Sequence, residues 1–293
     1  MSERVRRALV IALPFAWLAL FFLVPFVIVL GISLAEQAIG IPPYTPLLVR
    51  GAGGIELHAS LANFALLAAD PLYLRAYADA VLYAAAATAI ALLIGYPMAY
   101  AIVRAPKAWR NTLLLLVILP FWTSFLIRVY AWIGLLSNNG LVNSVLLALG
   151  LVRAPLPLLN NLFAVELGLV YSYLPFMVLP LYAALEKLDP ALLEAASDLG
   201  CRPAAAFRRV TLPLSLPGVM AGTLLVFIPM CGEFVIPDLL GGPSTLMIGK
   251  VLWDEFFTNR DWPVASAVAV AMLVLLLVPM GLLRRYLAGT TAD

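Results

Sequence analysis

Three carboxylate side chains occur in this sequence where nearly all neighbouring residues are apolar. Glu233 lies within an apolar run at roughly 214–237, Asp238 directly follows that run, and Glu166 lies near the start of another run at roughly 162–185. A carboxylate in or near hydrocarbon is costly unless it is paired or faces water, so such residues usually mark a pathway. These residue types in these positions point to the binding of a positively charged solute within a membrane.

Aromatic side chains accompany the carboxylates. The faces of Trp and Tyr rings attract ammonium groups. Four such residues are candidates: Tyr130 and Trp132 near the end of the run at roughly 112–136, and Tyr171 and Tyr173 within the run at roughly 162–185. The same residues also fit the belt that Trp and Tyr form at membrane surfaces. Arg128 could pair with one of the carboxylates, so the sequence leaves both interpretations of the aromatic residues open.

A second distinctive segment, "EAASDLGCRPAAAFRRVTLP", covers residues 194–213 between two apolar runs. Just before it, Asp189 and Pro190 are typical of a helix start, whereas Gly200 is typical of a left-handed helix stop. We therefore expect a helix of about ten residues that ends near Gly200. Pro203 then begins a second helix that runs toward the membrane.

The first of these two helices is amphipathic. Its polar residues Glu194, Ser197 and Asp198 point away from an apolar face. The apolar face consists of Leu188, Leu192, Ala195, Ala196 and Leu199. Small alanine side chains let another surface approach the backbone closely, so the helix suits insertion into the groove of a partner. The alternative is a hairpin that lies on the lipid headgroups.

The elements that must position these residues are membrane helices. Hydrophobic residues make up 64% of the 293 residues and charged residues only 12%, whereas soluble domains are about half apolar. Runs of about 20 apolar residues, enough to cross about 30 Å of hydrocarbon, predict six spans. The spans are roughly 9–32, 80–103, 112–136, 162–185, 214–237 and 262–283.

Basic residues are distributed unevenly between the two sides that alternating spans would define. Of the 18 Lys and Arg residues, twelve fall on one side and five in the longer loops of the other. Because an excess of Lys and Arg marks the cytoplasmic side, we expect both termini to be cytoplasmic. The helical rise then puts Glu233 in the outer third of the fifth span, with Asp79, Arg128, Glu166 and Asp238 near the outer surface.

The basic start and first apolar run could instead be a secretory signal, with Ser33-Leu34-Ala35 as its cleavage site. The run exceeds the usual core of about 7–15 residues, so we expect an uncleaved first span.

Several kinds of catalytic machinery are missing from the sequence. The nearest approach to a phosphate-binding loop, "GGPSTLMIGKV", has the wrong glycine spacing and places Val251 after Lys250, so we expect no ATPase activity in this chain. A single histidine, His58, provides neither a His-based metal site nor a Ser-His-Asp triad. Cys201 and Cys231 predict no disulfide framework and no metal spacing. We expect no catalytic residue and no metal in this chain.

The 194–213 segment resembles the EAA loop of bacterial ABC importer permeases. The matching positions are Glu194, Ala195, Ala196, Gly200, Val210, Leu212 and Pro213, with Val210 where Ile is usual. In that family the loop is a coupling helix that sits in a cleft of the cytoplasmic ATPase subunit. The resemblance implies the same role here.

Longer stretches resemble the first permease of spermidine/putrescine importers, and most of all the putrescine type. They are "LPFWTSFLIRVYAWIGLL" (119–136), "GEFVIPDLLGGPSTLMIGKVLWDEFFTNRDWPVASAVAV" (232–270), "IPPYTPL" (41–47) and "DPLY" (70–73). The resemblance implies a polyamine substrate, putrescine rather than spermidine. The candidate pathway residues are Glu233, Asp238, Glu166, Trp132, Tyr171 and Tyr173.

We therefore predict an all-α membrane protein with six transmembrane helices and the fold of a type I ABC importer permease, in the bacterial inner membrane. Its expected parts are a first helix with a long periplasmic loop (1–75), a permease core (76–285) that includes the coupling loop (186–213), and a short cytoplasmic tail (286–293). The resemblance implies a homologous second permease, two copies of a cytoplasmic ABC ATPase and a periplasmic polyamine-binding protein. ATP and Mg would be used by the ATPase, and this chain would bind no cofactor.

Two rival functions remain compatible with a polytopic membrane protein. A secondary transporter of a small organic cation would be driven by an ion gradient and need no ATPase, but the 186–213 loop argues against it. A membrane enzyme would need a clustered acid/base or metal set, which the sequence does not offer.

Overall fold

The structure, a computed structural model, describes residues 3–51, 54–243 and 245–290. It is mostly helical, with one short β-hairpin. The chain forms two compact units, one comprising residues 1–75 with 251–275 and the other comprising 76–250 with 276–293. The last three residues of the expected tail 286–293 lie outside the described part of the chain.

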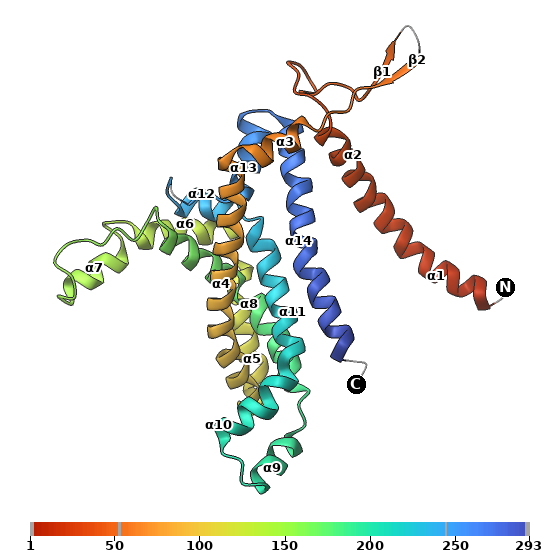
Figure 1. The fold of residues 1–293 in the computed structure, drawn as a ribbon. Helices are drawn as coiled ribbons and strands as arrows, with labels where there is room; N and C mark the ends of the chain where they lie inside the picture. The colour runs from red at the N-terminus through yellow and green to blue at the C-terminus, as the bar shows by residue number, and fades with distance from the viewer. Residues whose placement is uncertain (1–2, 52–53, 244, 291–293) are drawn as a thin grey trace. The chain divides into compact units, whose positions relative to one another are not determined.

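The larger unit contains the helices that carry the candidate sites. Several of them run alongside one another, and the short helices α9 and α12 lie at opposite ends of α11 (Figure 1). The elements are α4 (Pro71–Arg104, which begins in the smaller unit), α5 (Lys107–Ile118), the 3₁₀ helix η2 (Leu119–Trp122), α6 (Phe125–Leu136), α7 (Leu141–Ala148), α8 (Leu162–Glu186), α9 (Pro190–Asp198), α10 (Pro203–Ala206), the π-helical turn η3 (Phe207–Thr211), α11 (Leu212–Cys231) and α12 (Val235–Leu240).

The smaller unit contains the first helix and the segment that follows it. The amide of Asn63 donates hydrogen bonds to the carbonyl oxygens of Ser33 (2.9 Å) and Ala35 (2.8 Å), which ties α3 to the end of α2. Its elements are α1 (Glu3–Leu18), η1 (Ala19–Leu23), α2 (Val24–Ser33), the antiparallel strands β1 (Leu48–Gly51) and β2 (Gly54–Leu57), α3 (Ala62–Ala69) and η4 (Asp254–Thr258). Two further helices, α13 (Ile248–Trp253) and α14 (Trp262–Thr290), belong partly to each unit.

The helices that could span a membrane lie largely where the apolar runs predict them. Five helical stretches of the described residues are long and apolar enough to cross a membrane, and Trp262–Val278 within α14 is a shorter apolar helix. The five are Val10–Ser33, Pro71–Arg104, Phe125–Ala148, Leu162–Glu186 and Pro203–Cys231. Exposed apolar side chains, which lipid would cover, line the first stretch throughout.

The third predicted span, 112–136, is wrong as a single helix. The chain forms α5 and then the 3₁₀ turn η2, and Thr123 and Ser124 are extended before α6 begins. Pro120 lies in the turn, and the Thr123 hydroxyl donates to its carbonyl oxygen at 2.8 Å. Pro120 has no N–H to donate within a helix, and the Thr123 hydroxyl bonds a carbonyl oxygen that a continuing helix would use. Together these two features explain the break.

The fifth predicted span, 214–237, also differs in its limits. One continuous helix runs from Pro203 through η3 and α11 to Cys231, so the second helix of the coupling loop is the start of the span itself. The helix ends at Gly232, and Glu233 therefore lies in the junction before α12 rather than within the span.

Helices α8 and α11 pack at very close range because α11 presents glycines to α8. A Cβ at Gly222 would lie 2.8 Å from the sulfur and 3.2 Å from the carbonyl oxygen of Met177. A Cβ at Gly218 would press on Ala184 and lie 2.9 Å from the carbonyl oxygen of Pro180. Small residues allow such approaches between membrane helices, where dispersion contacts replace the hydrophobic effect. The two helices therefore form one closely packed pair.

Gly218→Ala should destabilise the protein, whereas Gly134→Ala should not. A helical Gly→Ala change is favourable by about 1 kcal/mol where there is space, and a Cβ at Gly134 meets nothing within 4 Å. At Gly218 the clash is with backbone, and overpacking costs about 1–3 kcal/mol. Thermal unfolding of the purified chain in detergent should show a midpoint lowered by roughly 2–10 °C for Gly218→Ala only. Equal midpoints for the two variants would contradict the close packing.

Candidate functional site

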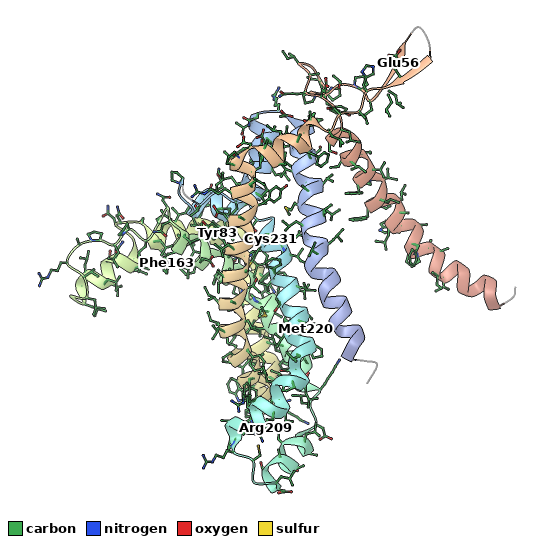
Figure 2. The ribbon with its side chains drawn as sticks, in the orientation of Figure 1. Glu56, Tyr83, Phe163, Arg209, Met220 and Cys231 are labelled. Atoms are coloured by element: carbon green, nitrogen blue, oxygen red, sulfur yellow. The ribbon has the colours of Figure 1, made fainter. Side chains whose placement is uncertain are left out.

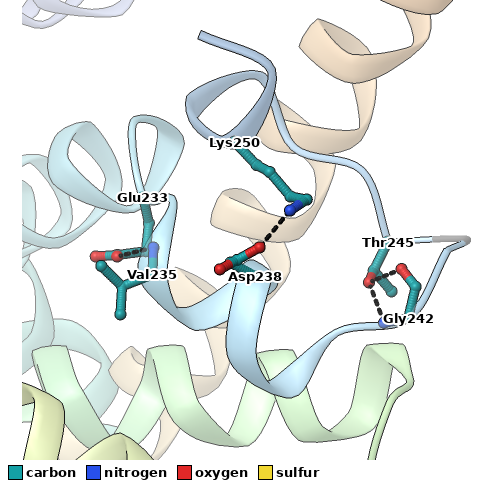
Figure 3. Close-up of polar contacts among 6 residues, drawn as sticks. All are labelled: Glu233, Val235, Asp238, Gly242, Thr245 and Lys250. Atoms are coloured by element: carbon teal, nitrogen blue, oxygen red, sulfur yellow. Dashed lines mark hydrogen bonds and ion pairs between the residues drawn. The ribbon is translucent and has the colours of Figure 1, made fainter. Parts of the chain in front are cut away.

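The Glu233 carboxylate is buried in the junction between α11 and α12, where it is 8% exposed. One oxygen, Oε2, accepts a hydrogen bond of 2.6 Å from the hydroxyl of Tyr173 on α8. The other, Oε1, accepts from the backbone N–H groups of Phe234 (3.2 Å) and Val235 (3.0 Å), as Figure 3 shows for Val235. The first N–H groups of a helix need an acceptor in apolar surroundings, and this side chain provides it.

A second element closes on the same junction. A Cβ at Gly249, next to Lys250, would lie 2.6 Å from the carbonyl oxygen of Glu233. Gly249 is therefore needed for the close approach of the two backbones. The carboxylate is thus held by α8 and by its own backbone, in a junction that the first turn of α13 approaches closely.

The other two candidate carboxylates lie in different surroundings. Asp238 on α12 forms an ion pair with Lys250, and its side chain is 49% exposed (Figure 3). Glu166 is on the first turns of α8, and both of its carboxylate oxygens are buried with no hydrogen-bond partner among the described residues. A buried carboxylate without a partner is costly, which favours a role for Glu166 toward a cation. Within the described part of the chain, Glu166 forms no hydrogen bond or ion pair with Glu233 or Asp238.

Arg128 does not pair with a carboxylate within the described residues. It is 9% exposed on α6, its Nε and Nη1 lack hydrogen-bond partners there, and its guanidinium lies 4.9 Å from the ring centre of Phe121 and 5.7 Å from that of Phe125. The helix breaks before α6, so the position of Arg128 does not follow from the rise along one straight third span. A buried arginine held by aromatic faces is an interaction that the sequence analysis did not predict.

The aromatic candidates divide into separate contacts. Trp132 and Tyr171 meet edge to face, with ring centres 5.4 Å apart, and Tyr173 lies 6.2 Å from Phe176 while it bonds Glu233. Tyr130 is 58% exposed. The structure thus brings one of these aromatic residues, Tyr173, into hydrogen-bond contact with a candidate carboxylate.

The predicted helix at 190–198 is confirmed together with both of its ends. The Asp189 carboxylate accepts a hydrogen bond of 3.0 Å from the N–H of Ala191, and Pro190 is the first helical residue. At the other end Gly200 has φ +75°, its N–H donates to Ser197, and the N–H of Cys201 donates to Ala196, each at 2.9 Å. This pair of bonds is the Schellman termination, which needs a left-handed residue.

The apolar face of α9 is uncovered. Leu199 is 89% exposed and Leu192 is 46% exposed, and Ala195 and Glu194 are exposed as well. Exposed leucines on a short capped helix next to a membrane are typical of a surface that another molecule covers. Of the remaining pattern positions, Val210 lies in η3, and Leu212 and Pro213 begin α11.

The coupling loop and the buried carboxylate are joined by the same two helices. Helix α8 carries Tyr173 and runs to the start of the loop, and α11 runs from the end of the loop to the junction that holds Glu233. In Figure 2, Arg209 lies near the loop end of α11 and Cys231 at the end next to the Glu233 junction. The loop therefore lies at one end of the α8–α11 pair and the Tyr173–Glu233 hydrogen bond toward the other.

The sequence analysis missed Lys250 and Gly249. In the sequence these two residues attracted notice only because they form part of a stretch that does not fit a phosphate-binding loop. In the structure Lys250 forms an ion pair with Asp238, and Gly249 allows the close approach to the Glu233 junction. The signal available was an isolated glycine and a lone lysine within an otherwise uncharged stretch, "GGPSTLMIGKVLW".

Glu233→Leu should destabilise the chain far more than Glu233→Gln does. Leucine leaves the Tyr173 hydroxyl and two backbone N–H groups without their acceptor, and each unsatisfied buried group costs about 1–3 kcal/mol. Glutamine keeps one carbonyl oxygen for the two backbone N–H groups, and its NH₂ group can donate to the Tyr173 hydroxyl oxygen. In detergent the midpoint of thermal unfolding should therefore be similar for the wild type and Glu233→Gln, and clearly lower for Glu233→Leu. A leucine variant as stable as the glutamine variant would show that these hydrogen bonds do not support the junction.

Comparisons with known proteins agree with one another. The sequence pattern of the family described as "Binding-protein-dependent transport system inner membrane component" matches residues 91–291. The chain is 41% identical over 266 residues to the spermidine/putrescine transport system permease protein PotB of Haemophilus influenzae, which covers 91% of this chain and 88% of that relative. It is 39% identical over 260 residues to PotB of Escherichia coli K12, with 89% of this chain and 90% of the relative covered.

Solved structures give the same fold. A bacterial ABC transporter involved in the import of the acidic polysaccharide alginate matches with a TM-score of 0.63 at 20% identity, covering 97% of this chain and 98% of that one. The MetNI methionine ABC transporter matches with a TM-score of 0.57 at 18% identity, covering 74% and 95%. At such identities the likeness shows the fold alone, and it confirms the expected permease fold. The chain therefore belongs to the family of inner membrane components of binding-protein-dependent transport systems, as a multi-pass ABC importer permease subunit that is not itself an enzyme and leaves ATP hydrolysis to a partner.

Proposed function

We propose that this chain forms half of the translocation pathway for a polyamine and couples that pathway to a separate ATPase through residues 186–213. The relatives that cover about nine tenths of the chain are named for spermidine and putrescine together. The preference for putrescine over spermidine rests on the sequence resemblance, because those names do not distinguish the two substrates. A diamine is the smaller of the two substrates and would need fewer anionic groups along its path.

The buried Glu233 carboxylate is the observation that carries this proposal. At 8% exposure it is an anion removed from water, and its partners are the neutral donors Tyr173, Phe234 and Val235 rather than a cation. These hydrogen bonds leave the carboxylate without a cationic partner among the described residues. An ammonium group that reaches the junction would supply the opposite charge. Glu166, with its unpartnered buried oxygens, would be a second anionic point, and Asp238, Trp132 and Tyr171 would complete the pathway.

The coupling role rests on the exposed face of α9. Leu199 and Leu192 present apolar surface beyond the end of α8, and the Schellman turn at Gly200 fixes the length of the helix. A rigid helix of this kind can enter a groove of an ATPase as one body. The pattern residues Glu194, Ala195, Ala196, Gly200, Val210, Leu212 and Pro213 would then form or position the docking surface. The excess of basic residues on this side of the spans supports a cytoplasmic location for the loop and for both termini.

The complete importer would contain more than this chain. We propose a homologous second permease, two copies of a cytoplasmic ABC ATPase that uses ATP and Mg, and a periplasmic binding protein that delivers the polyamine. The chain itself would bind no cofactor. Closure of the ATPases would move α9, and the α8–α11 pair would carry that movement toward the Tyr173–Glu233 junction.

Glu233→Gln should reduce polyamine uptake while the complex still assembles. The change removes one negative charge and keeps the hydrogen-bond acceptor, and a charged hydrogen bond contributes about 1.5–3 kcal/mol. Uptake of radiolabelled putrescine by proteoliposomes with the assembled importer should therefore fall about tenfold or more at low substrate concentration. Glu36→Gln, a change at an exposed carboxylate of the smaller unit, is the matched control and should leave uptake unchanged.

Competition with unlabelled amines tests the substrate in the same assay. Putrescine should compete best, spermidine less well, and an uncharged diol of similar length not at all. Uptake that persists without ATP would contradict the ATP-driven mechanism. Unchanged kinetics in Glu233→Gln would remove this carboxylate from the pathway.

A further inference from the structure

A cavity of about 350 Å³ lies behind the coupling helix, between the α4–α5 turn, the end of α8 and the first residues of α9. It is separate from the Glu233 junction and from the exposed Leu199 face of α9. Its lining residues with polar or charged groups are Tyr100, Arg104, Lys107, Arg110, Glu186 and Thr211. Apolar side chains, including Val103, Leu185 and Leu193, line the rest. The cavity is thus both basic and apolar.

The charges in this cavity are not balanced by the described residues. Arg110 is engaged, because its Nε donates to the carbonyl oxygen of Ala105 at 3.0 Å and its Nη1 lies 3.9 Å from the Glu186 carboxylate. Arg104 contacts the ring of Tyr100 at 4.5 Å. Within the described part of the chain, neither Arg104 nor Lys107 has a carboxylate at ion-pair distance. Two cations therefore remain available to an anion.

Thr211 supplies an independent sign of a missing ligand. It lines the cavity, is 2% exposed, and its hydroxyl has no hydrogen-bond partner among the described residues. A buried hydroxyl without a partner costs about 1–3 kcal/mol. In a helix a threonine usually bonds a carbonyl of the preceding turn, and this one does not. A bound acceptor in the cavity would satisfy it.

The position of the cavity decides the kind of anion. Arg104 is the last residue of the apolar helix α4, and the cavity also contacts the end of α8, so it lies at the level where membrane spans meet water. Basic pockets between helices at this level suit the headgroups of anionic lipids. The apolar part of the lining suits the glycerol and first methylenes of a lipid, which a free phosphate ion lacks.

We propose that this cavity binds the phosphodiester headgroup of an anionic phospholipid, with Arg104 and Lys107 facing its charge and the Thr211 hydroxyl donating to a phosphate oxygen. The bound lipid fills the space between α9 and the membrane helices, so it limits the movement of α9 toward them. The inference concerns the lipid and does not require that the transported solute be a polyamine.

Lipid retention by the full chain tests this proposal. The chain is delipidated, incubated with equal amounts of dioleoyl phosphatidylglycerol and dioleoyl phosphatidylcholine, and examined by native mass spectrometry. The wild type should retain phosphatidylglycerol about tenfold more often than phosphatidylcholine, equivalent to about 1.4 kcal/mol. Arg104→Gln combined with Lys107→Gln should abolish the preference. Arg208→Gln combined with Arg209→Gln changes two exposed arginines of η3 that do not line the cavity, and should preserve the preference.

Thr211→Val separates the hydroxyl from the fold around it. Valine has nearly the same shape, so the lipid-free variant should unfold at the same temperature as the wild type or higher, while its preference for phosphatidylglycerol should fall. A wild type that retains both lipids equally would overturn the proposal. So would stabilisation by inorganic phosphate as large as that by phosphatidylglycerol, because the site would then take a soluble anion. A preference that survives the Arg104/Lys107 change would place the lipid elsewhere.

Discussion

The close packing of α8 against α11 is the constraint on which the rest of this structure depends. Gly218 and Gly222 bring the two backbones together against Pro180 and Met177. The segment that contains α9 connects these two helices, so in the proposed mechanism a rigid pair would carry a displacement of α9 along its length. The buried Tyr96–Ser215 hydrogen bond of 2.8 Å attaches α4 to the same pair. The proposed import mechanism requires this stiffness.

Backbone hydrogen bonding explains why the carboxylate lies where it does. Inside hydrocarbon a broken helix must find partners for its free N–H groups, and irregular backbone is tolerated only where protein or water covers it. At the end of α11 the Glu233 side chain accepts from the next two N–H groups, and Tyr173 fixes its other oxygen. One side chain thus stabilises the junction with both of its oxygens. The structural role of Glu233 and its proposed transport role are separable by substitution, since the first needs an acceptor and the second needs a charge.

The sequence predicted best those features that local chemistry decides. The ends of α9 followed from Asp189, Pro190 and Gly200, because caps and left-handed turns are encoded within a few residues. The apolar runs gave the approximate positions of the spans. The breaks at Thr123–Ser124 and at Gly232 were not predicted, because apolarity alone does not show where a helix stops inside a membrane. The partners Tyr173, Gly249 and Lys250 come from distant segments, and one sequence contains no signal that joins them to Glu233 or Asp238.

The central claim is that movement of the coupling helix reaches the Glu233 junction through the α8–α11 pair. Cys231, the last residue of α11, is 1% exposed and is a free thiol beside that junction. Its alkylation rate in the assembled importer, measured in a Cys201→Ser background with and without ATP and vanadate, reports opening at this end directly. The account predicts that trapping the ATPase changes the rate at Cys231 several-fold. An identical rate in both states would show that the junction does not respond to the ATPase and would contradict the account.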